Sequence, residues 1–509
     1  MNNLFLGSGL IYFVAFAGCG SSEPSSTSGS GGSAGAHASG GNGTGGTTAT
    51  DGDAGRDATG GAAGARGTGG GTGGVAGPGT GGGSGGVATG GRAGIAGGPG
   101  GNAGASATGG SAGSGGNGTG GAGGAANVAY NGPPMGFNPY NNQWCNTTEA
   151  QMHAFTDAVV SKGLKAAGYT YVNLDCAWQG TRNSSGVIQA ASTFPSGIKA
   201  LGDYIHGKGL KFGIYTAPGA TTCDNKPGSQ GHETQDVNTY ASWGADYIKL
   251  DWCGADYSAS GAAAIAQTWK NAIAASGRPM VLSINAGAST SVAAWASTHV
   301  NLWRVGDDIC DTWFNKTGSR NAGYTHCTDT TYQSGIYDYL TMSLDYLGPY
   351  SGNGHWGDPD MLQVGNGGLN LEEAKTHFSI WAMWSAPLIA GNDVTKMNGS
   401  DIASKVLLNT EVIAIDQDAK NNWATRIRND SSVQIYKKTL QAAGTYAVAL
   451  VNMTNSAASI TVKWSDLGLS TVTTMRDLWA HSDITPSGTS YTATNVPAHG
   501  TIMLKLTGN

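Results

Sequence analysis

Short apolar runs alternate with stretches of helical periodicity along residues 128–420. The apolar runs predict strands at 169–175, 210–216, 247–252, 279–285 and 300–306. The stretches between them predict helices at 148–168, 196–209, 234–245 and 260–277. Repeated strand–helix units are typical of a parallel sheet, and a segment of this length favours a (β/α)8 TIM barrel over an open doubly wound sheet. We therefore expect an α/β barrel domain over 128–420.

After about residue 421 the pattern changes to short segments in which apolar and polar residues alternate. This alternation predicts strands in the segments SVQIYKK, TYAVALVNM, SITVKW, SYTATNV and GTIMLKL. Together they predict a C-terminal antiparallel β-sandwich over 421–509. No cluster of catalytic side chains stands out in this part, so we expect the sandwich to support the barrel by packing against it.

The first part of the chain follows neither pattern. Residues 20–127 are almost entirely Gly, Ala, Ser and Thr, which predicts a disordered Gly-rich tether because little apolar surface is available for burial. Residues 1–19 contain an apolar run too short to cross a membrane, which predicts a signal peptide. The run ends in FAGC and resembles a bacterial lipobox, in which Cys19 is lipidated. We expect a lipoprotein on the outer surface or periplasmic face of a bacterial membrane, with ordinary secretion as the alternative.

Charge and cysteine content restrict the kinds of partner and the cellular compartment that we expect for this chain. The net charge is −6 with no basic block, which argues against a nucleic-acid partner, and membrane contact is expected only through the lipid. Seven cysteines are present, and six remain once Cys19 is set aside, an even number that suits an oxidising compartment. No CxxC spacing, glycine-rich GxGxxG motif or P-loop occurs where such a site requires it, so we expect neither a metal nor a cofactor.

Polar side chains stand at the ends of five predicted strands: Asp175, Tyr215, Asp251, Asn285 and the pair Asp307–Asp308. A single strand-end acid is more often a cap or a salt-bridge partner. In a barrel, however, the carboxyl ends of the strands surround the active site, and acids recurring on separate strands favour chemistry. Two carboxylates across an aromatic-lined pocket are what glycoside hydrolysis requires.

An ordered set of motifs extends from Pro133 to the C-terminus. The segments are PPMGFNPYNNQWC (133–145), FPSGIKALGDYIHGKGLKFGIYT (194–216), DYIKLDWC (246–253), LWRVGDDI (302–309), GHWGDPDML (354–362), SAPLIAGNDV (385–394) and VPAHGTIMLKL (496–506). In this order they resemble glycoside hydrolase family 27, the melibiase-type α-galactosidases. The resemblance implies a retaining hydrolase that removes terminal α-D-galactosyl residues from oligo- or polysaccharides by double displacement.

The resemblance also implies roles for individual residues. Asp251 occupies the nucleophile position of the family's K-x-D-x-C motif, and Asp308 the acid/base position of W-R-x-x-x-D. Asp307 is the competing assignment, but counting from Trp303 and Arg304 favours Asp308. Lys249 is expected to contact a sugar hydroxyl, and its charge is expected to keep Asp251 ionised.

Further binding roles follow in the same way. Arg304 matches a residue that reaches the 2-hydroxyl, and Asp175 the first of two acids that hold the 4- and 6-hydroxyls. Tyr215 and Trp178 are expected to line the pocket. The alternatives are an internal Lys249–Asp175 salt bridge and a structural pair between Arg304 and Asp307.

Two other aspects of the motifs stay open. Asp358 and Asp360 are interpreted as helix-cap and structural acids in preference to substrate contacts. Trp144, Trp178 and Trp356 are either core residues or pocket walls, and we favour pocket walls.

Two departures from the family pattern affect the pocket and its disulfides. The family reads D-D-C-W where this chain has Asp175-Cys176-Ala177-Trp178, so the second sugar-binding acid is missing. Either Cys176 takes over the disulfide to Cys145, or the alignment slips by one residue. Cys223 and Cys253 match the family's disulfide beside the nucleophile, which leaves Cys310 and Cys327 as a third pair.

The second departure is at the family's C-E-W run, where this chain has Ile284-Asn285-Ala286. Asn285 is able to bind a hydroxyl as a neutral amide, while Ala286 removes a wide ring. The sugar is therefore less certain than the reaction. The alternatives are a β-L-arabinopyranosidase, an α-N-acetylgalactosaminidase, an α-glucan hydrolase or, from another class, a non-catalytic surface glycan-binding lipoprotein.

Overall fold

A computed structural model of the chain describes residues 132–287, 290–315 and 333–509. The expected signal peptide, lipidated Cys19 and tether lie outside these residues. The described part contains an eight-stranded parallel sheet in the order β11-β8-β7-β6-β5-β2-β1-β12. A parallel bridge between Leu362, which follows β11, and Ala390 in β12 joins the two ends of this order. The sheet is the closed barrel of a TIM-like fold.

The barrel strands are short and almost completely buried. They are β1 (Met135–Phe137), β2 (Tyr171–Leu174), β5 (Lys211–Thr216), β6 (Ala245–Asp251), β7 (Val281–Asn285), β8 (Leu302–Arg304), β11 (Trp356–Asp358) and β12 (Leu388–Ala390). Both faces of a parallel barrel strand are covered, so its sequence reads as a continuous apolar run. This explains why the apolar runs of the sequence located the strands.

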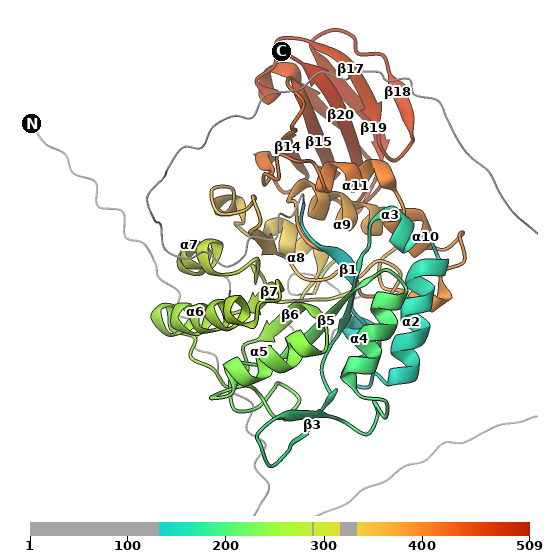
Figure 1. The fold of residues 1–509 in the computed structure, drawn as a ribbon. Helices are drawn as coiled ribbons and strands as arrows, with labels where there is room; N and C mark the ends of the chain where they lie inside the picture. The colour runs from blue at the N-terminus through green and yellow to red at the C-terminus, as the bar shows by residue number, and fades with distance from the viewer. Residues whose placement is uncertain (1–131, 288–289, 316–332) are drawn as a thin grey trace, which may run out of the picture. The chain divides into compact units, whose positions relative to one another are not determined.

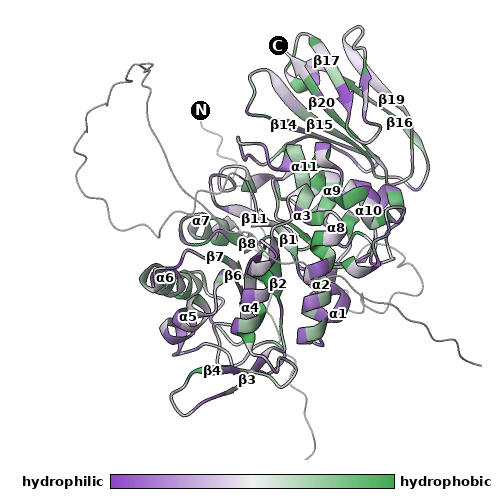
Figure 2. Cartoon of the chain, turned by 45° about the vertical axis from the view of Figure 1, so that its right-hand side comes forward, coloured by the Kyte–Doolittle hydropathy of each residue, from purple (hydrophilic) through white to green (hydrophobic). Residues whose placement is uncertain are grey.

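Helices surround the barrel strands (Figure 1). They include α2 (Glu149–Ser161), α4 (Ile198–Gly207), α5 (Glu233–Ser242), α6 (Ala259–Ser276), α7 (Thr290–His299) and α9 (Leu371–Met383). In Figure 2 these helices carry both hydrophilic and hydrophobic segments, as expected of elements with one buried face. Among the described residues, no helix is both long and apolar enough to cross a bilayer.

One expected helix is divided in the structure. The predicted helix 148–168 is two helices, α2 and the short α3 (Leu164–Ala167). Gly163 separates them with a φ of +90°, a left-handed conformation that ends a right-handed helix. Helical periodicity continued across this break, which is why the sequence did not indicate it.

The C-terminal part is a β-sandwich. Its larger sheet has six strands: β13 (Thr425–Asn429), β14 (Val433–Thr439), β15 (Thr445–Asn452), β20 (Thr501–Gly508), β17 (Val472–Asp477) and β18 (Ser482–Ile484). A second sheet pairs β16 (Ala458–Lys463) with β19 (Ser490–Val496). All pairings in both sheets are antiparallel.

Strand β15 shows how the sandwich joins the barrel domain. Its residues Ala447, Ala449 and Val451 belong to the large core that includes the barrel helices, whereas Val448 and Leu450 belong to the sandwich core. Successive side chains of a strand point to opposite faces, so one face of the six-stranded sheet is shared with the barrel domain. A strand with two buried faces fits its almost unbroken apolar sequence.

Candidate active site

The expected catalytic residues meet in one cleft at the carboxyl ends of the barrel strands. Its walls include Tyr140, Trp144, Lys249, Asp251, Arg304 and Asp308. Tyr140 follows β1, Lys249 and Asp251 lie in β6, and Arg304 ends β8. The parallel strands place these side chains at the same end of the barrel, which is where TIM barrels carry their active sites.

Asp251 is the last residue of β6, next to Asn285 at the end of β7 in the parallel register. The Asn285 amide Nδ2 donates a hydrogen bond of 3.2 Å to Asp251 Oδ1. Burial raises the pKa of the Asp251 carboxyl above its ordinary value, and the positive charge of Lys249 opposes this rise without cancelling it. Lys249 therefore favours the ionised nucleophile, as expected, but burial has the larger effect.

Lys249 in the cleft wall forms an ion pair with Asp175, which is buried behind that wall. The Lys249 ammonium lies 2.8 Å from Asp175 Oδ2, and Asn138 Nδ2 donates to the same oxygen at 2.6 Å. The other oxygen of Asp175 accepts the Cys176 backbone N–H at 3.0 Å, and Asp175 is only 2% exposed. The internal salt bridge, which was the alternative to sugar contacts by Lys249 and Asp175, is thus present, and in this arrangement the Asp175 carboxylate is already engaged by the protein.

The ammonium of Lys249 also lies near two aromatic rings, 5.2 Å from the centre of Tyr140 and 5.4 Å from that of Tyr215. Burial, the largest single influence, lowers the pKa of Lys249. The charges of Asp175 and Asp251 together outweigh burial and raise that pKa above its usual range. Lys249 is therefore a fixed positive charge beside the nucleophile.

Asp308 stands at the cleft with its carboxylate half exposed, at 53%. Arg304 Nη2 donates to Asp308 Oδ1 at 3.0 Å. Asp307 is placed differently: its carboxylate accepts the Ser334 hydroxyl at 2.9 Å, and its backbone carbonyl accepts bonds from Arg304 and Tyr339. The structure brings Asp308 and not Asp307 to the cleft wall, in agreement with the count from Trp303 and Arg304.

Neither Asp358 nor Asp360 caps a helix, so that part of the expectation is wrong, whereas the structural role expected beside it fits Asp360. Asp358 ends β11, and Asp360 follows it two residues later. Asp360 forms an ion pair with Arg304 at 3.1 Å and accepts the Ile309 N–H at 2.8 Å, so it holds the segment that carries the acid/base candidate. Burial raises the pKa of Asp358 to about 6, with Arg304 opposing. Both acids line the space inside the barrel beneath the cleft.

Trp178 does not line the cleft, which corrects the expectation for it. The residue is fully buried, its indole N–H donates to the Tyr215 carbonyl at 2.8 Å, and its ring packs edge-on against Tyr240 and Trp243. Trp356 is also a core residue. Trp144, in contrast, is 38% exposed at the cleft. An aromatic residue near a strand end looks the same in the sequence whether it lies in the core or in the cleft wall. The direction of the backbone at that residue decides between the two positions.

Tyr215 lies beside the nucleophile, behind the cleft surface. It is 1% exposed, and the charges of Asp251 and Asp175 add to burial in raising its pKa far above the usual range. Its hydroxyl accepts the Cys223 N–H at 3.4 Å.

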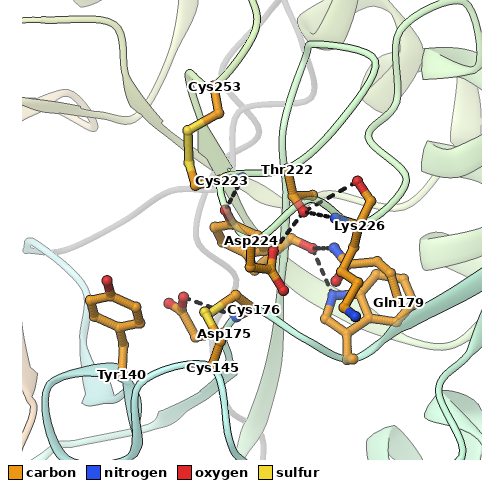
Figure 3. The surroundings of a disulfide bond; sticks show 12 residues. Tyr140, Cys145, Asp175, Cys176, Gln179, Thr222, Cys223, Asp224, Lys226 and Cys253 are labelled. Carbon is orange, nitrogen blue, oxygen red and sulfur yellow. Dashed lines mark hydrogen bonds between the residues drawn. A yellow bond between two sulfur atoms is a disulfide. The ribbon is translucent and has the colours of Figure 1, made fainter. Parts of the chain in front are cut away.

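Two disulfides connect the loops around this site, as Figure 3 shows. Cys145 is bonded to Cys176, next to Asp175, and Cys223 to Cys253, two residues beyond the nucleophile candidate. Cys176 has therefore taken over the bridge to Cys145. Ala177 beside it adopts a φ of +64°. Cys310 is disulfide-bonded, and its expected partner Cys327 lies outside the described residues.

Sequence reasoning missed three residues of the site. It assigned no role to Asn138 or Tyr140, and it did not predict that Asp360 connects Arg304 to Ile309. All three stand inside motifs that carried the resemblance, PPMGFNPYNNQWC and GHWGDPDML. The available signal was the tight clustering of polar and aromatic residues directly after a short strand. The partners of Asn138 and Asp360 are 37 to 56 residues away along the chain, and Lys249, which lies near the Tyr140 ring, is farther away still, so no local pattern indicates them.

Comparison with known proteins decides the family. The sequence profile of the family described as Alpha galactosidase A matches residues 139–418, which is more than half of the chain. The chain belongs to this family. A second profile of the alpha-galactosidase relatives, described as the Alpha galactosidase C-terminal beta sandwich domain, matches residues 430–506.

Individual members of the alpha-galactosidase family are similar over most of the described chain. Alpha-galactosidase A of Cellvibrio japonicus is 40% identical over 388 residues, covering 74% of this chain and 91% of that protein. The alpha-galactosidase of Oryza sativa is 38% identical, with 74% and 85% covered. The crystal structure of alpha-galactosidase I from Mortierella vinacea has a TM-score of 0.69 at 34% identity, covering 76% of this chain and all of that one.

Proposed function

We propose that the protein is a retaining α-galactosidase that removes terminal α-D-galactosyl residues from oligo- or polysaccharides. The observation that carries the proposal is that Asp251 and Asp308 line one cleft, each with a cation nearby. Lys249 lies next to Asp251, and Arg304 is bonded to Asp308. Membership of the alpha-galactosidase family supports the choice of sugar.

In the first step Asp251 attacks the anomeric carbon while Asp308, as the acid, protonates the departing glycosidic oxygen. The bond between the sugar and the leaving group breaks, and a galactosyl ester of Asp251 forms. In the second step Asp308, now a carboxylate, takes a proton from a water molecule that attacks the same carbon. The ester bond breaks, α-galactose leaves, and both carboxyl groups return to their starting states.

The surroundings of the two acids suit these roles. Asp251 is partly buried and receives the Asn285 amide, which fixes the orientation of the carboxylate. Asp308 is half exposed and therefore reaches both a leaving group and water. Lys249 and Arg304 balance the charge of the acids, and both line the same cleft. Two carboxyl groups placed in different environments take different parts of the reaction.

A panel of four aryl glycosides tests the proposal: α-galactoside, α-N-acetylgalactosaminide, β-L-arabinopyranoside and α-glucoside. We expect the α-galactoside to have the highest kcat/KM by more than tenfold. A tenfold preference for another sugar would overturn the galactoside assignment and leave a different specificity on the same catalytic pair. Binding of glycans without hydrolysis of any of the four would establish a non-catalytic protein instead.

The disulfides of the described domain indicate an oxidising compartment and therefore export. The finer proposal is a lipid anchor at Cys19 followed by a Gly-rich tether, based on the FAGC segment. Replacement of Cys19→Ser is expected to move the protein from the membrane fraction to the soluble fraction. An unchanged membrane fraction would contradict lipidation at this residue.

A further inference from the structure

Three large apolar or aromatic side chains are exposed among the described residues: Trp144 at 38%, Val160 at 39% and Tyr257 at 48%. Val160 is on the outer helix α2 and has an ordinary surface position. Single exposed apolar residues of this kind need no explanation. The two aromatic residues are different: Trp144 lines the catalytic cleft, and Tyr257 lies in the loop that follows β6 at the carboxyl end of the barrel, in the same loop as Cys253.

Trp144 forms part of the wall of the cleft that contains Asp251 and Asp308. Tyr257 follows β6 in the loop beyond the nucleophile. Partial burial, followed by the charges of Asp251 and Asp308, raises the pKa of the Tyr257 hydroxyl, which agrees with the position of this loop beside the nucleophile strand. The rim of the site therefore carries two aromatic side chains that are partly open to solvent.

Trp144 is held in place at a cost to the fold. Its backbone has a φ of +54°, a region that bulky side chains rarely adopt. The next residue, Cys145, is tied to Cys176, and the indole packs edge-on against Tyr140 with 5.8 Å between ring centres. An aromatic ring that is strained, anchored and still exposed is preorganised for contact with a ligand.

The chemistry of the cleft separates two regions. The charged groups Lys249, Asp251 and Arg304 surround the reacting sugar, whereas the rim presents aromatic rings. Such rings bury the apolar face of a flat ligand and leave polar groups at its edge free for water. A pyranose ring has this character, with C–H bonds on its faces and hydroxyls at its edge.

We propose that Trp144 and Tyr257 form an aglycone subsite that binds a pyranose ring of the leaving group. The inference rests on the proposed α-galactosidase function and assigns two residues to the leaving-group side of that site. The favoured substrates are galactosyl groups attached to a further sugar, as in oligo- and polysaccharides. Cys176 stands in the position of the family's second sugar-binding acid. Its disulfide to Cys145, the neighbour of Trp144, also anchors Trp144 at the rim.

The test compares two substrates that share the galactosyl group. Melibiose has a glucopyranose leaving group, whereas α-galactosyl fluoride has only fluoride and leaves the aglycone subsite empty. The readout is the ratio of kcat/KM for melibiose to kcat/KM for the fluoride. For Trp144→Ala we expect this ratio to fall by about threefold to tenfold, the range of one aromatic contact.

Further variants separate the subsite from general damage. Tyr257→Ala should lower the ratio in the same direction. Trp144→Phe should keep most of the wild-type ratio because a ring remains. Val160→Ala, the matched exposed residue on α2, should keep both rate constants at the wild-type level. Thermal unfolding of each variant shows whether it folds, and Trp144→Phe with Tyr257→Ala tests the subsite even where Trp144→Ala does not fold.

The outcomes distinguish this inference from the proposed function. Equal losses on melibiose and on the fluoride in both Trp144→Ala and Tyr257→Ala would overturn the subsite while leaving the α-galactosidase intact. An unchanged ratio in both variants would do the same. If the wild-type enzyme hydrolyses neither substrate, the proposed function fails, and the subsite fails with it.

Discussion

Asp251 and Asp308 illustrate how the protein gives two identical side chains different properties. Asp251 is partly buried, receives an amide hydrogen bond from Asn285 and lies near the charge of Lys249. Asp308 is half exposed and bonded to Arg304. The first environment fixes a carboxylate against the sugar, and the second allows proton exchange with water and the leaving group.

Removal of the nucleophile gives the first prediction. Asp251→Gly should abolish hydrolysis of every glycoside, because no covalent intermediate forms. Azide, which fits the space of the missing side chain, should restore turnover of an activated aryl α-galactoside and give β-galactosyl azide. Mass spectrometry and NMR identify this product. Formation of α-galactosyl azide would contradict attack from the face assigned to Asp251.

The acid Asp308 has a comparison residue directly beside it. Asp308→Ala should lower kcat/KM by about 100-fold to 10,000-fold on melibiose, and far less on a dinitrophenyl galactoside whose leaving group needs no proton. Asp307→Ala removes the bond to Ser334 outside the cleft wall and should show no dependence on the leaving group. A stronger leaving-group dependence for Asp307→Ala would exchange the two assignments.

Asp358 predicts a pH dependence of stability. Its folded-state pKa of about 6 is above the ordinary value of 3.8, so between these values the folded protein holds a proton that the unfolded chain has lost. The free energy of unfolding therefore decreases as pH rises through about 6. The side chain of Asp358→Asn stays neutral at every pH. Between pH 4 and pH 7 the free energy of unfolding of this variant, relative to that of the wild type, should therefore rise by about 2–3 kcal/mol, which unfolding experiments across this range measure.

The control for this prediction is Asp203→Asn, because Asp203 is an exposed acid on α4 paired with the equally exposed Lys199. This surface substitution should change the free energy of unfolding by less than about 0.5 kcal/mol. If the curves for Asp358→Asn and the wild type run parallel across the same range, the Asp358 carboxyl does not titrate near pH 6.

Several residue assignments were within reach of the sequence, and others were not. Asp251 and Asp308 were predictable because each ends or follows a strand within a specific motif. The burial of Trp178 and the engagement of Asp175 by Asn138 were not. Both depend on where a side chain meets a partner 37 or more residues away. Sequence spacing specifies which end of the barrel a residue occupies, but not which way its side chain turns.

At the level of elements, periodicity predicted the barrel strands and the sandwich strands because each has a distinct apolar pattern. It failed between α2 and α3, where a single left-handed glycine divides a continuous helical pattern. The almost unbroken apolar sequence of β15 fits burial on both faces, but it gave no indication of what covers the second face. The covering residues include those of helices that are distant in sequence.

Strand β14 contains a buried contact between the sandwich and the barrel domain. The ammonium of Lys438 donates to the carbonyls of Ala382 and Ile415 at 2.9 and 2.8 Å and to the Ser385 hydroxyl at 2.7 Å. These acceptors lie in α9, in α11 (Thr410–Asp416) and in the turn after α9. A single side chain therefore satisfies three buried acceptors from two segments.

Lys438→Met should lower the free energy of unfolding by about 2–4 kcal/mol, because it leaves buried acceptors without their donor. Thermal or urea unfolding measures this loss. The control is Lys463→Met on the exposed end of β16, which should change stability by less than about 0.5 kcal/mol. Equal effects of the two substitutions would show that the Lys438 contacts contribute nothing specific.

For the whole molecule, the catalytic candidates and their supporting disulfides all come from residues 132–315 and 333–509. A protein truncated before residue 128 should therefore retain the wild-type kcat/KM on melibiose, which steady-state kinetics measures directly. A loss of more than tenfold would show that the N-terminal residues act in catalysis or in folding of the barrel.

The fold class was predictable from sequence at this scale because the alternation of strands and helices and the length of the segment suffice to indicate a barrel.

The stereochemistry of the first-formed sugar tests the central claim most directly. Proton NMR of the wild-type enzyme acting on an aryl α-galactoside distinguishes α-galactose from β-galactose before the two interconvert. A double displacement through Asp251 predicts α-galactose as the first product. Initial appearance of β-galactose would show a single displacement by water and would contradict the assignment of Asp251 as nucleophile.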